Sequence, residues 1–308
     1  MKILFMGTPE FAKENLKALC EDGGNEIVGV ISQPDKPQGR HMELIPTPVK
    51  AYALSQGISV YQPETLKDNA ILPLLRELAP ELIVVVAYGK ILPEYVLNFP
   101  KYGCVNMHAS LLPRFRGAAP IQRAVMAGDK ITGITAMYME KGLDTGDMIM
   151  KAEIEIGEEQ TSGELHDALA ELGGKVLLET VGLIKNGDVK AEKQDDSKAT
   201  YAHMLTKAEG EIDWSKSAQE INNRVRGLNP WPMAFTFLGG KRIVIDRVTI
   251  AEGSGEPGEV ISAEGALVVA CGEGAVEIDS LKPEGKKKMP VSEYLRGHKI
   301  DKKTILGR

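Results

Sequence analysis

Three polar side chains in the middle of the chain have the types that acyl transfer requires. Asn106 and His108 stand two residues apart in an apolar run, and Asp144 follows in a turn flanked by Gly142 and Gly146. An amide can donate to a developing oxyanion, and an imidazole can stabilise charge or move a proton. A carboxylate can orient the imidazole. Together these side chains indicate chemistry at a carbonyl carbon.

The apolar run at residues 104–109 reads as a strand that would position this pair. Because side chains alternate along a strand, Asn106 and His108 would share one face. Open α/β sheets bind ligands at the carboxyl ends of their strands. Taken singly, a strand histidine is more often structural, and an aspartate beside glycine is ordinary turn chemistry. For Arg114 and Arg116, surface charge and anion contact both stay open.

The first part of the chain alternates apolar strands with helices. The alternation predicts an α/β fold with a Rossmann-like, mostly parallel sheet. No GxGxxG sequence follows the first strand, so a nicotinamide dinucleotide site is not supported. We expect strands at residues 2–7, 26–32, 82–88, 104–109, 132–139 and 148–156, and an amphipathic helix at residues 67–78.

The second part has a different character. Residues 189–206 are polar and lack apolar periodicity, which predicts a linker between a catalytic domain at 1–188 and a second domain at 207–308. Short strands broken by glycine follow and predict a small, OB-like β-barrel. We expect them at residues 234–238, 242–250, 258–262, 266–270 and 276–281.

Composition bounds the class of protein. With 308 residues, 43% of them apolar and 26% charged, the chain has the composition of a globular protein of two domains. Cys20, Cys104 and Cys271 are scattered, which argues against a disulfide framework or a zinc site and fits a reducing cytosol. No apolar run approaches the roughly 18 residues that span a bilayer. We therefore expect a cytoplasmic protein without a metal.

Charge is distributed unevenly. The net charge of −6 argues against general affinity for nucleic acid. Residues 282–308 nevertheless carry nine basic and three acidic side chains, and Lys286, Lys287 and Lys288 form a cluster. A basic end on an acidic body permits a local polyanion contact, although a solvated end would have the same composition.

Four short motifs occur together around the candidate residues. They are Asn106-x-His108, the segment 110–113 (SLLP), the segment 116–122 (RGAAPIQ) and the segment 143–147 (LDTGD). Jointly they resemble the signature of the formyltetrahydrofolate-dependent formyltransferases. Residues 6–11 (MGTPEF) and 228–232 (LNPWP) resemble the branch of that family that acts on charged tRNA. The resemblance extends over nearly the whole chain.

The resemblance implies a reaction and its site. The formyl group of 10-formyltetrahydrofolate would pass to the α-amino group of methionine on initiator methionyl-tRNA, with Asn106, His108 and Asp144 as catalytic residues. The implied folate-binding residues are Ser110, Leu111, Leu112, Pro113, Tyr88, Gly89 and Ile91.

The resemblance also implies how tRNA is bound. Residues 33–48 form a proline-rich loop that would enter the acceptor end of the tRNA, with Arg40 as its basic residue. The family commonly has further basic residues there, whereas this chain has His41, Met42 and Glu43. Lys286, Lys287 and Lys288 are the candidate tRNA contacts of the second domain, and we expect a monomer.

Two other functions stay open at this point. The first is a formyltransferase that acts on an amino sugar or a ribonucleotide amine, and the second domain argues against it. The other is a non-catalytic nucleic-acid-binding protein, and the intact set of Asn106, His108 and Asp144 argues against that.

Overall fold

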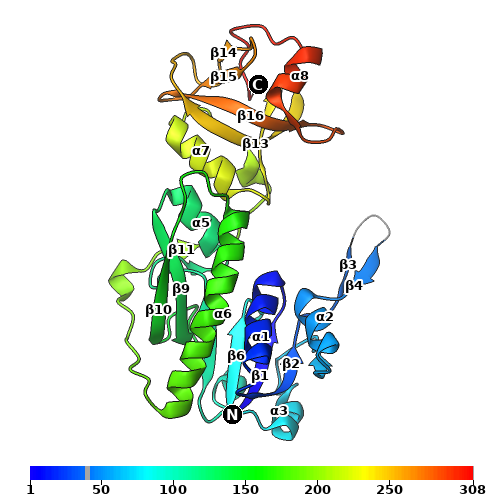
Figure 1. Cartoon of the computed structure of the whole chain (residues 1–308), viewed down its shortest axis with the longest axis vertical. Helices are drawn as coiled ribbons and strands as arrows, with labels where there is room; N and C mark the ends of the chain where they lie inside the picture. Colours follow the sequence, from blue (N-terminus) through cyan, green and yellow to red (C-terminus); the bar gives the residue numbers. More distant parts are fainter. Residues whose placement is uncertain (39–41, 308) are drawn as a thin grey trace. The chain divides into compact units, whose positions relative to one another are not determined.

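The computed structural model describes residues 1–38 and 42–307 (Figure 1). The chain divides into two compact units. The first comprises residues 1–117, 131–154 and 166–202, and the second comprises residues 118–130, 155–165 and 203–308. Residues 189–202, expected to lie in a linker, therefore cluster with the first unit.

A seven-stranded sheet forms the centre of the first unit, in the order β10-β9-β7-β6-β1-β2-β5. The pairs β7–β6, β6–β1, β1–β2 and β2–β5 are parallel, whereas β9 runs antiparallel to β7. The predicted Rossmann-like, mostly parallel sheet is confirmed. Its strands are β1 (Lys2–Gly7), β2 (Glu26–Ile31), β5 (Val60–Tyr61), β6 (Leu82–Val86), β7 (Cys104–His108), β9 (Ile131–Tyr138) and β10 (Met148–Glu155).

Burial follows the sequence pattern in this sheet. All five residues of β6 are buried, as are five of the six residues of β1, because both strands lie inside the sheet. The helices of this part of the chain are α1 (Glu10–Asp22), α2 (Pro48–Ser55), α3 (Leu72–Leu78), α4 (Glu94–Leu97) and α6 (Ser162–Asn186). Helices α1 and α6 approach closely, since a Cβ atom on Gly174 would lie 2.9 Å from Cβ of Ala18.

Two segments differ from expectation. The helix expected at residues 67–78 begins only at Leu72, because Asp68 and Asn69 have φ angles of 54° and 58°, which a right-handed helix excludes. Within residues 33–48, expected to be a loop, β3 (Lys36–Gln38) pairs antiparallel with β4 (Glu43–Ile45). We call residues 36–38 and 42–45 the arm.

The second unit is built on an antiparallel sheet, in the order β12-β13-β16-β15-β14, and β17 also pairs with β16. Residues 303–307 form hydrogen bonds to both ends of this strand order, at β12 and beside β14. Leu306 N–H donates to Gly258 O beside β14, and Gly307 N–H donates to Phe237 O in β12, each at 2.8 Å. The sheet thus curls into the predicted small barrel. Its strands are β12 (Ala234–Leu238), β13 (Lys241–Ala251), β14 (Val260–Ser262), β15 (Leu267–Ala270), β16 (Ala275–Pro283) and β17 (Met289–Pro290).

The barrel is filled by apolar side chains that include Trp214, Ile245 and Ile278, each at most 5% exposed. The helices of this unit are α5 (Pro120–Ala127), α7 (Ala218–Gly227) and α8 (Val291–Gly297). A capping box between Ser217 and Glu220 begins α7. Among the described residues, no helix combines the length and apolar character needed to cross a membrane.

Candidate active site

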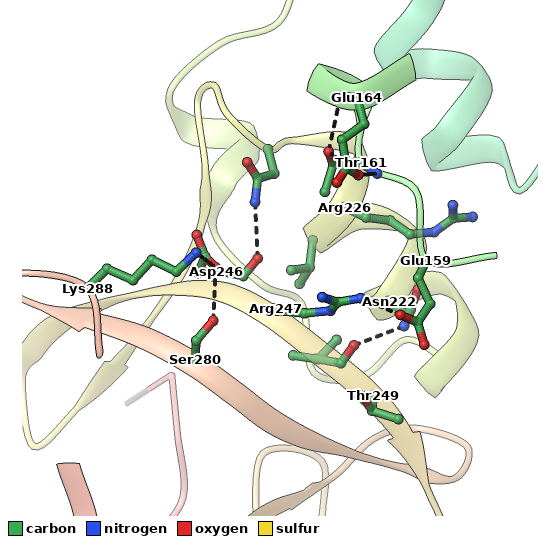
Figure 2. Close-up of a pocket in the computed structure, with 13 residues that line it drawn as sticks. Glu159, Thr161, Glu164, Asn222, Arg226, Asp246, Arg247, Thr249, Ser280 and Lys288 are labelled. Atoms are coloured by element: carbon green, nitrogen blue, oxygen red, sulfur yellow. Dashed lines mark hydrogen bonds and ion pairs between the residues drawn. The ribbon is translucent and has the colours of Figure 1, made fainter. Parts of the chain in front are cut away.

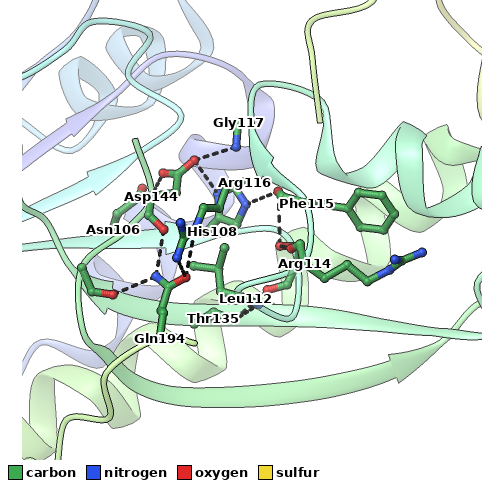
Figure 3. A network of polar contacts seen from close by, with 12 residues as sticks. Asn106, His108, Leu112, Arg114, Phe115, Arg116, Gly117, Thr135, Asp144 and Gln194 are labelled. Atoms are coloured by element: carbon green, nitrogen blue, oxygen red, sulfur yellow. Dashed lines mark hydrogen bonds and ion pairs between the residues drawn. The ribbon is translucent and has the colours of Figure 1, made fainter. Parts of the chain in front are cut away.

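Asn106 and His108 lie at the carboxyl end of β7, and Asp144 lies between β9 and β10 (Figure 3). The distance from His108 Nδ1 to Asp144 Oδ2 is 3.7 Å, and these side chains are 6% and 13% exposed. Asn106 Nδ2 donates to Asp144 Oδ1 at 3.4 Å. The structure therefore brings together the three residues that the sequence singled out.

The second nitrogen of His108 fixes the orientation of the ring. Nε2 lies 2.8 Å from the carbonyl oxygen of Phe115. A carbonyl only accepts, so Nε2 carries the hydrogen and donates it. Nδ1 is then the nitrogen that gains or loses a proton, and it faces Asp144. This arrangement suits a ring that takes up positive charge next to a carboxylate.

Asp144 is held by the backbone as well. Gly117 N–H donates to its Oδ2 at 2.8 Å. Gly117 has a φ of 111°, and a Cβ atom there would lie 2.9 Å from the carbonyl oxygen of Ala202. Gly117 belongs to β8 (Arg116–Gly117), which pairs in parallel with β11 (Tyr201–Ala202). Glycine is therefore required where this short pairing delivers an N–H group to the carboxylate.

Arg116 is a buried residue that supports the acidic turn of the site. It is 2% exposed, and its Nη2 donates to Gln194 Oε1 at 2.8 Å and to Asp196 Oδ1 at 2.7 Å. Gln194 Nε2 in turn donates to the carbonyl oxygens of Asp144 and Gly146, each at 2.8 Å. Arg116, whose role the sequence left open, thus holds the glutamine that fixes the backbone of the acidic turn.

Gln194 was missed in the sequence, because it stands in a polar segment without periodicity that was expected to be a linker. No sequence signal marks it. Arg114, the other open arginine, is exposed and lies with its Cζ 4.3 Å from the centre of the Phe115 ring.

The segment 110–113 leaves β7 as a tight turn. Ser110 Oγ donates to Arg114 O at 2.6 Å. Thr135 of β9 donates through Oγ1 to Ser110 O at 2.7 Å and accepts from Leu112 N–H at 3.1 Å. Thr135, which the sequence did not single out, is fully buried and stands opposite His108 in the β7–β9 register. Its hydroxyl therefore fixes the backbone of the predicted folate-binding segment 110–113 through two hydrogen bonds.

The side chains of this segment point in different directions. Leu112 is 1% exposed and packs with Met137 and Met148. Leu111 and Pro113 are partly exposed. Leu111 and Pro113 are therefore the members of the motif that can touch a ligand directly.

The other predicted folate residues follow β6. Tyr88 is 2% exposed, burial raises the pKa of its hydroxyl to about 12, and this hydroxyl has no hydrogen-bond partner among the described residues. Its carbonyl oxygen accepts from Thr8 Oγ1 and from Gln33 Nε2, each at 3.1 Å. Gly89 is exposed, and Ile91 is 86% exposed. Ile91 therefore offers apolar surface, and Tyr88 packs into the core.

The predicted tRNA contacts lie in separate parts of the chain. Arg40 lies outside the described residues. Lys286, Lys287 and Lys288 are exposed between β16 and β17 in the second unit. Lys288 Nζ lies 2.5 Å from Asp246 Oδ2, beside a polar cavity of about 410 Å³ (Figure 2). Lys288 therefore already has an anionic partner.

Metal ligands are not grouped in the part of the chain that the structure describes. Among residues 1–38 and 42–307, no three His, Cys, Asp or Glu side chains are placed to hold a metal ion.

Comparison with known proteins places these observations in a family. The family described as formyl transferase matches residues 1–181, and the formyl transferase C-terminal domain matches residues 204–299. The methionyl-tRNA formyltransferase of Alkaliphilus oremlandii is 51% identical over 310 residues, which cover all of both chains.

Solved structures show the same fold at low identity. The N-formyltransferase of Helicobacter canadensis, in complex with folinic acid and dTDP-3-aminofucose, has a TM-score of 0.67 at 17% identity, covering 94% of this chain and all of that one. HypX of Aquifex aeolicus, in complex with tetrahydrofolic acid, has a TM-score of 0.63 at 18% identity, covering 99% of this chain and 50% of that one.

Proposed function

The chain belongs to the formyl transferase family, and on this premise we propose that it formylates initiator methionyl-tRNA. The formyl group would come from 10-formyltetrahydrofolate and pass to the α-amino group of methionine. The observation that carries the proposal is the convergence of Asn106, His108 and Asp144 at the carboxyl end of β7. The full-length similarity to methionyl-tRNA formyltransferases supports the choice of acceptor.

The attacking group needs little activation. Free α-amines have a pKa of about 7.7–8.0, and the neighbouring ester lowers that of an aminoacyl group further, so much of the amine is neutral at pH 7. The protein must therefore stabilise the negative charge that develops on the formyl oxygen. The amide of Asn106 would donate to that oxygen, aided by the positive charge of a protonated His108.

Asp144 would serve the proton transfer. Its carboxylate lies 3.7 Å from His108 Nδ1 and balances positive charge on the ring. The attacking amine must lose a proton, and the departing N10 nitrogen must gain one. We propose that Asp144 and His108 Nδ1, with a bridging water, carry this proton from the amine to N10.

The residues present fit a flat, polar-edged ring system such as the pterin. Leu111 and Pro113, which follow the catalytic strand, and the exposed Ile91, which follows β6, offer apolar surface, and the backbone at Gly89 offers polar groups. Ser110 and Leu112 would hold the turn rather than touch the ligand, because their side chains are buried. We propose that the buried Tyr88 likewise supports its own segment after β6 rather than touching the ligand.

For the tRNA, we propose Arg40 as an acceptor-end contact and Lys286 and Lys287 as sequence-independent phosphate contacts. Lys288 would contribute less, because its ammonium group already binds Asp246. We propose that residues 207–308 are the tRNA-binding part of the chain, and that the catalytic part at residues 1–188 is completed by Gln194, which holds the turn of Asp144.

The test is a formylation assay with the purified full-length chain. It is incubated with 10-formyltetrahydrofolate and either initiator or elongator methionyl-tRNA, and with an amino-sugar nucleotide as a third acceptor. We expect N-formylmethionyl ester from the initiator tRNA at a rate well above that of the other two. Faster formylation of the amino sugar would overturn the proposal.

A further inference from the structure

Both ends of the arm meet at one carboxylate. Asp35, just before β3, accepts hydrogen bonds from Lys50 Nζ at 2.5 Å and from Gln62 Nε2 at 2.7 Å. It also accepts from the backbone N–H of Thr47, just after β4. One side chain thus joins the residue that enters the arm to the residues that leave it.

The partners of Asp35 bind one another. Lys50 Nζ donates to Gln62 Oε1 at 2.7 Å, and Gln62 Nε2 donates to Gln33 O at 2.8 Å. The side chains of Asp35 and Lys50 are 20% and 23% exposed, so water screens this ion pair only in part. Hydrogen bonding to Lys50 accordingly lowers the pKa of Asp35. We call Asp35, Lys50 and Gln62 the clamp.

The clamp connects to the sheet through Gln33. Gln33 N–H donates to Thr8 Oγ1 at 3.4 Å, and its side chain shares the carbonyl oxygen of Tyr88 with Thr8. Ser32 Oγ and Thr47 Oγ1 lie 2.6 Å apart. The base of the arm is therefore tied to the carboxyl ends of β1, β2 and β6.

The strand register places this base relative to the catalytic pair. Asn106 pairs with Val85, Val85 with Met6, and Met6 with Ile31. Strands in a sheet are about 4.8 Å apart, so Asn106 and the end of β2 are separated by about 14 Å along one edge. An arm that leaves the sheet at this edge can fix the position of a long substrate over the site.

We propose that the clamp is a positioning device: it sets where the arm leaves the sheet edge, and hence where the acceptor end of the tRNA meets Asn106 and His108. This inference rests on the proposed function for its substrate. The alternative is that the clamp only stabilises the fold. A fold-stabilising contact would lower the melting temperature without changing the use of tRNA relative to folate.

The test compares three single variants of the full-length chain, and the double variant Asp35→Asn/Lys50→Met, with the wild type. Asp35→Asn keeps the shape of the side chain and removes its charge, and Lys50→Met removes the other partner. Glu171→Gln is the matched control, because it breaks the exposed pair with Lys175 on α6. The measurements are hydrogen exchange of the backbone amides in β3 and β4, and KM for tRNA and for the formyl donor.

We expect Asp35→Asn and Lys50→Met to speed amide exchange in β3 and β4 about tenfold, because the hydrogen bonds at the base of the arm then open more often. Both should raise KM for tRNA about tenfold or more, with KM for the formyl donor within about twofold of wild type. The effect of the double variant should be smaller than the sum of the two single effects, since both substitutions remove the Asp35–Lys50 pair. Glu171→Gln should change neither exchange nor KM.

Unchanged exchange in folded Asp35→Asn and Lys50→Met would overturn the clamp. Faster exchange with an unchanged KM for tRNA would overturn its positioning role and leave a stabilising contact. A wild-type chain that formylates no charged tRNA would overturn the proposed function instead, and the exchange comparison would still decide whether the clamp orders the arm.

Discussion

Replacing Asp144 by asparagine tests the electrostatic core of the mechanism. Asparagine keeps the size of the side chain and an oxygen that can accept from Gly117 N–H, which now binds the carboxylate at 2.8 Å. The substitution removes the negative charge 3.7 Å from His108 Nδ1. The fold should therefore persist while the partner of the charged ring is lost.

The magnitude follows from the geometry. Two unit charges near 4 Å attract by about 4 kcal/mol at an effective dielectric constant of about 20. Each 1.36 kcal/mol is a factor of ten in rate, so full loss of this attraction from the transition state corresponds to roughly a thousandfold. The remaining dipole of asparagine recovers part of it. We expect the turnover of Asp144→Asn to fall by about 10²–10³.

The assay is formylation of initiator methionyl-tRNA at saturating formyl donor, with circular dichroism to verify folding. Asp147→Asn is the control, because Asp147 lies in the same turn and its side chain is exposed. It should retain nearly full turnover. A folded Asp144→Asn protein within threefold of the wild-type rate would refute the role assigned to the carboxylate.

Three further predictions follow from the surroundings of the site and from burial. Gly117→Ala should destabilise the fold by about 1–3 kcal/mol, seen as a lower melting temperature, and slow formylation at least tenfold. The reason is that the φ of 111° and the carbonyl oxygen of Ala202 exclude a side chain. An unchanged melting temperature would contradict this prediction. Burial raises the pKa of Cys104 to about 12 and of Cys271 to about 11, so iodoacetamide at pH 8 should modify both only after unfolding, as mass spectrometry of digests would show. The lowered pKa of Asp35 contributes stability that is present above its unfolded pKa of about 3.9 and is lost as the pH falls through the folded value. The stability of Asp35→Asn, followed by urea titration, should therefore depend less on pH below about 4, and an identical profile would argue against the pair with Lys50.

Strand periodicity was enough to place Asn106 and His108 on one face, since it depends only on alternation along one strand. The position of Asp144 next to His108 could not be derived in that way. It depends on the antiparallel pairing of β9 with β7, which the local pattern does not specify, and only the family motifs indicated it. Gln194 and Thr135 had no signal of either kind, because their roles arise from contacts between segments that are distant in sequence.

The limits of local patterns also appear in the elements. The apolar spacing of residues 67–78 suited a helix, but Asp68 and Asn69 adopt left-handed backbone conformations that periodicity does not report. The ribbon of β3 and β4 was hidden by the prolines of its segment, whereas the buried strands β1 and β6 were visible as continuous apolar runs.

The segment that closes the barrel, residues 303–307, has a consequence for how the second unit folds. Residues 303–307 bond to Phe237 and Gly258, which are synthesised much earlier, so the wall stays open until this late segment emerges. Contacts between such distant residues also form slowly, because the chain must first lose loop entropy. Until then β14 and the end of β12 at Phe237 present unpaired backbone groups, which are templates for pairing with other chains. Nascent chains stalled before residue 303 should thus aggregate more readily than the full-length chain.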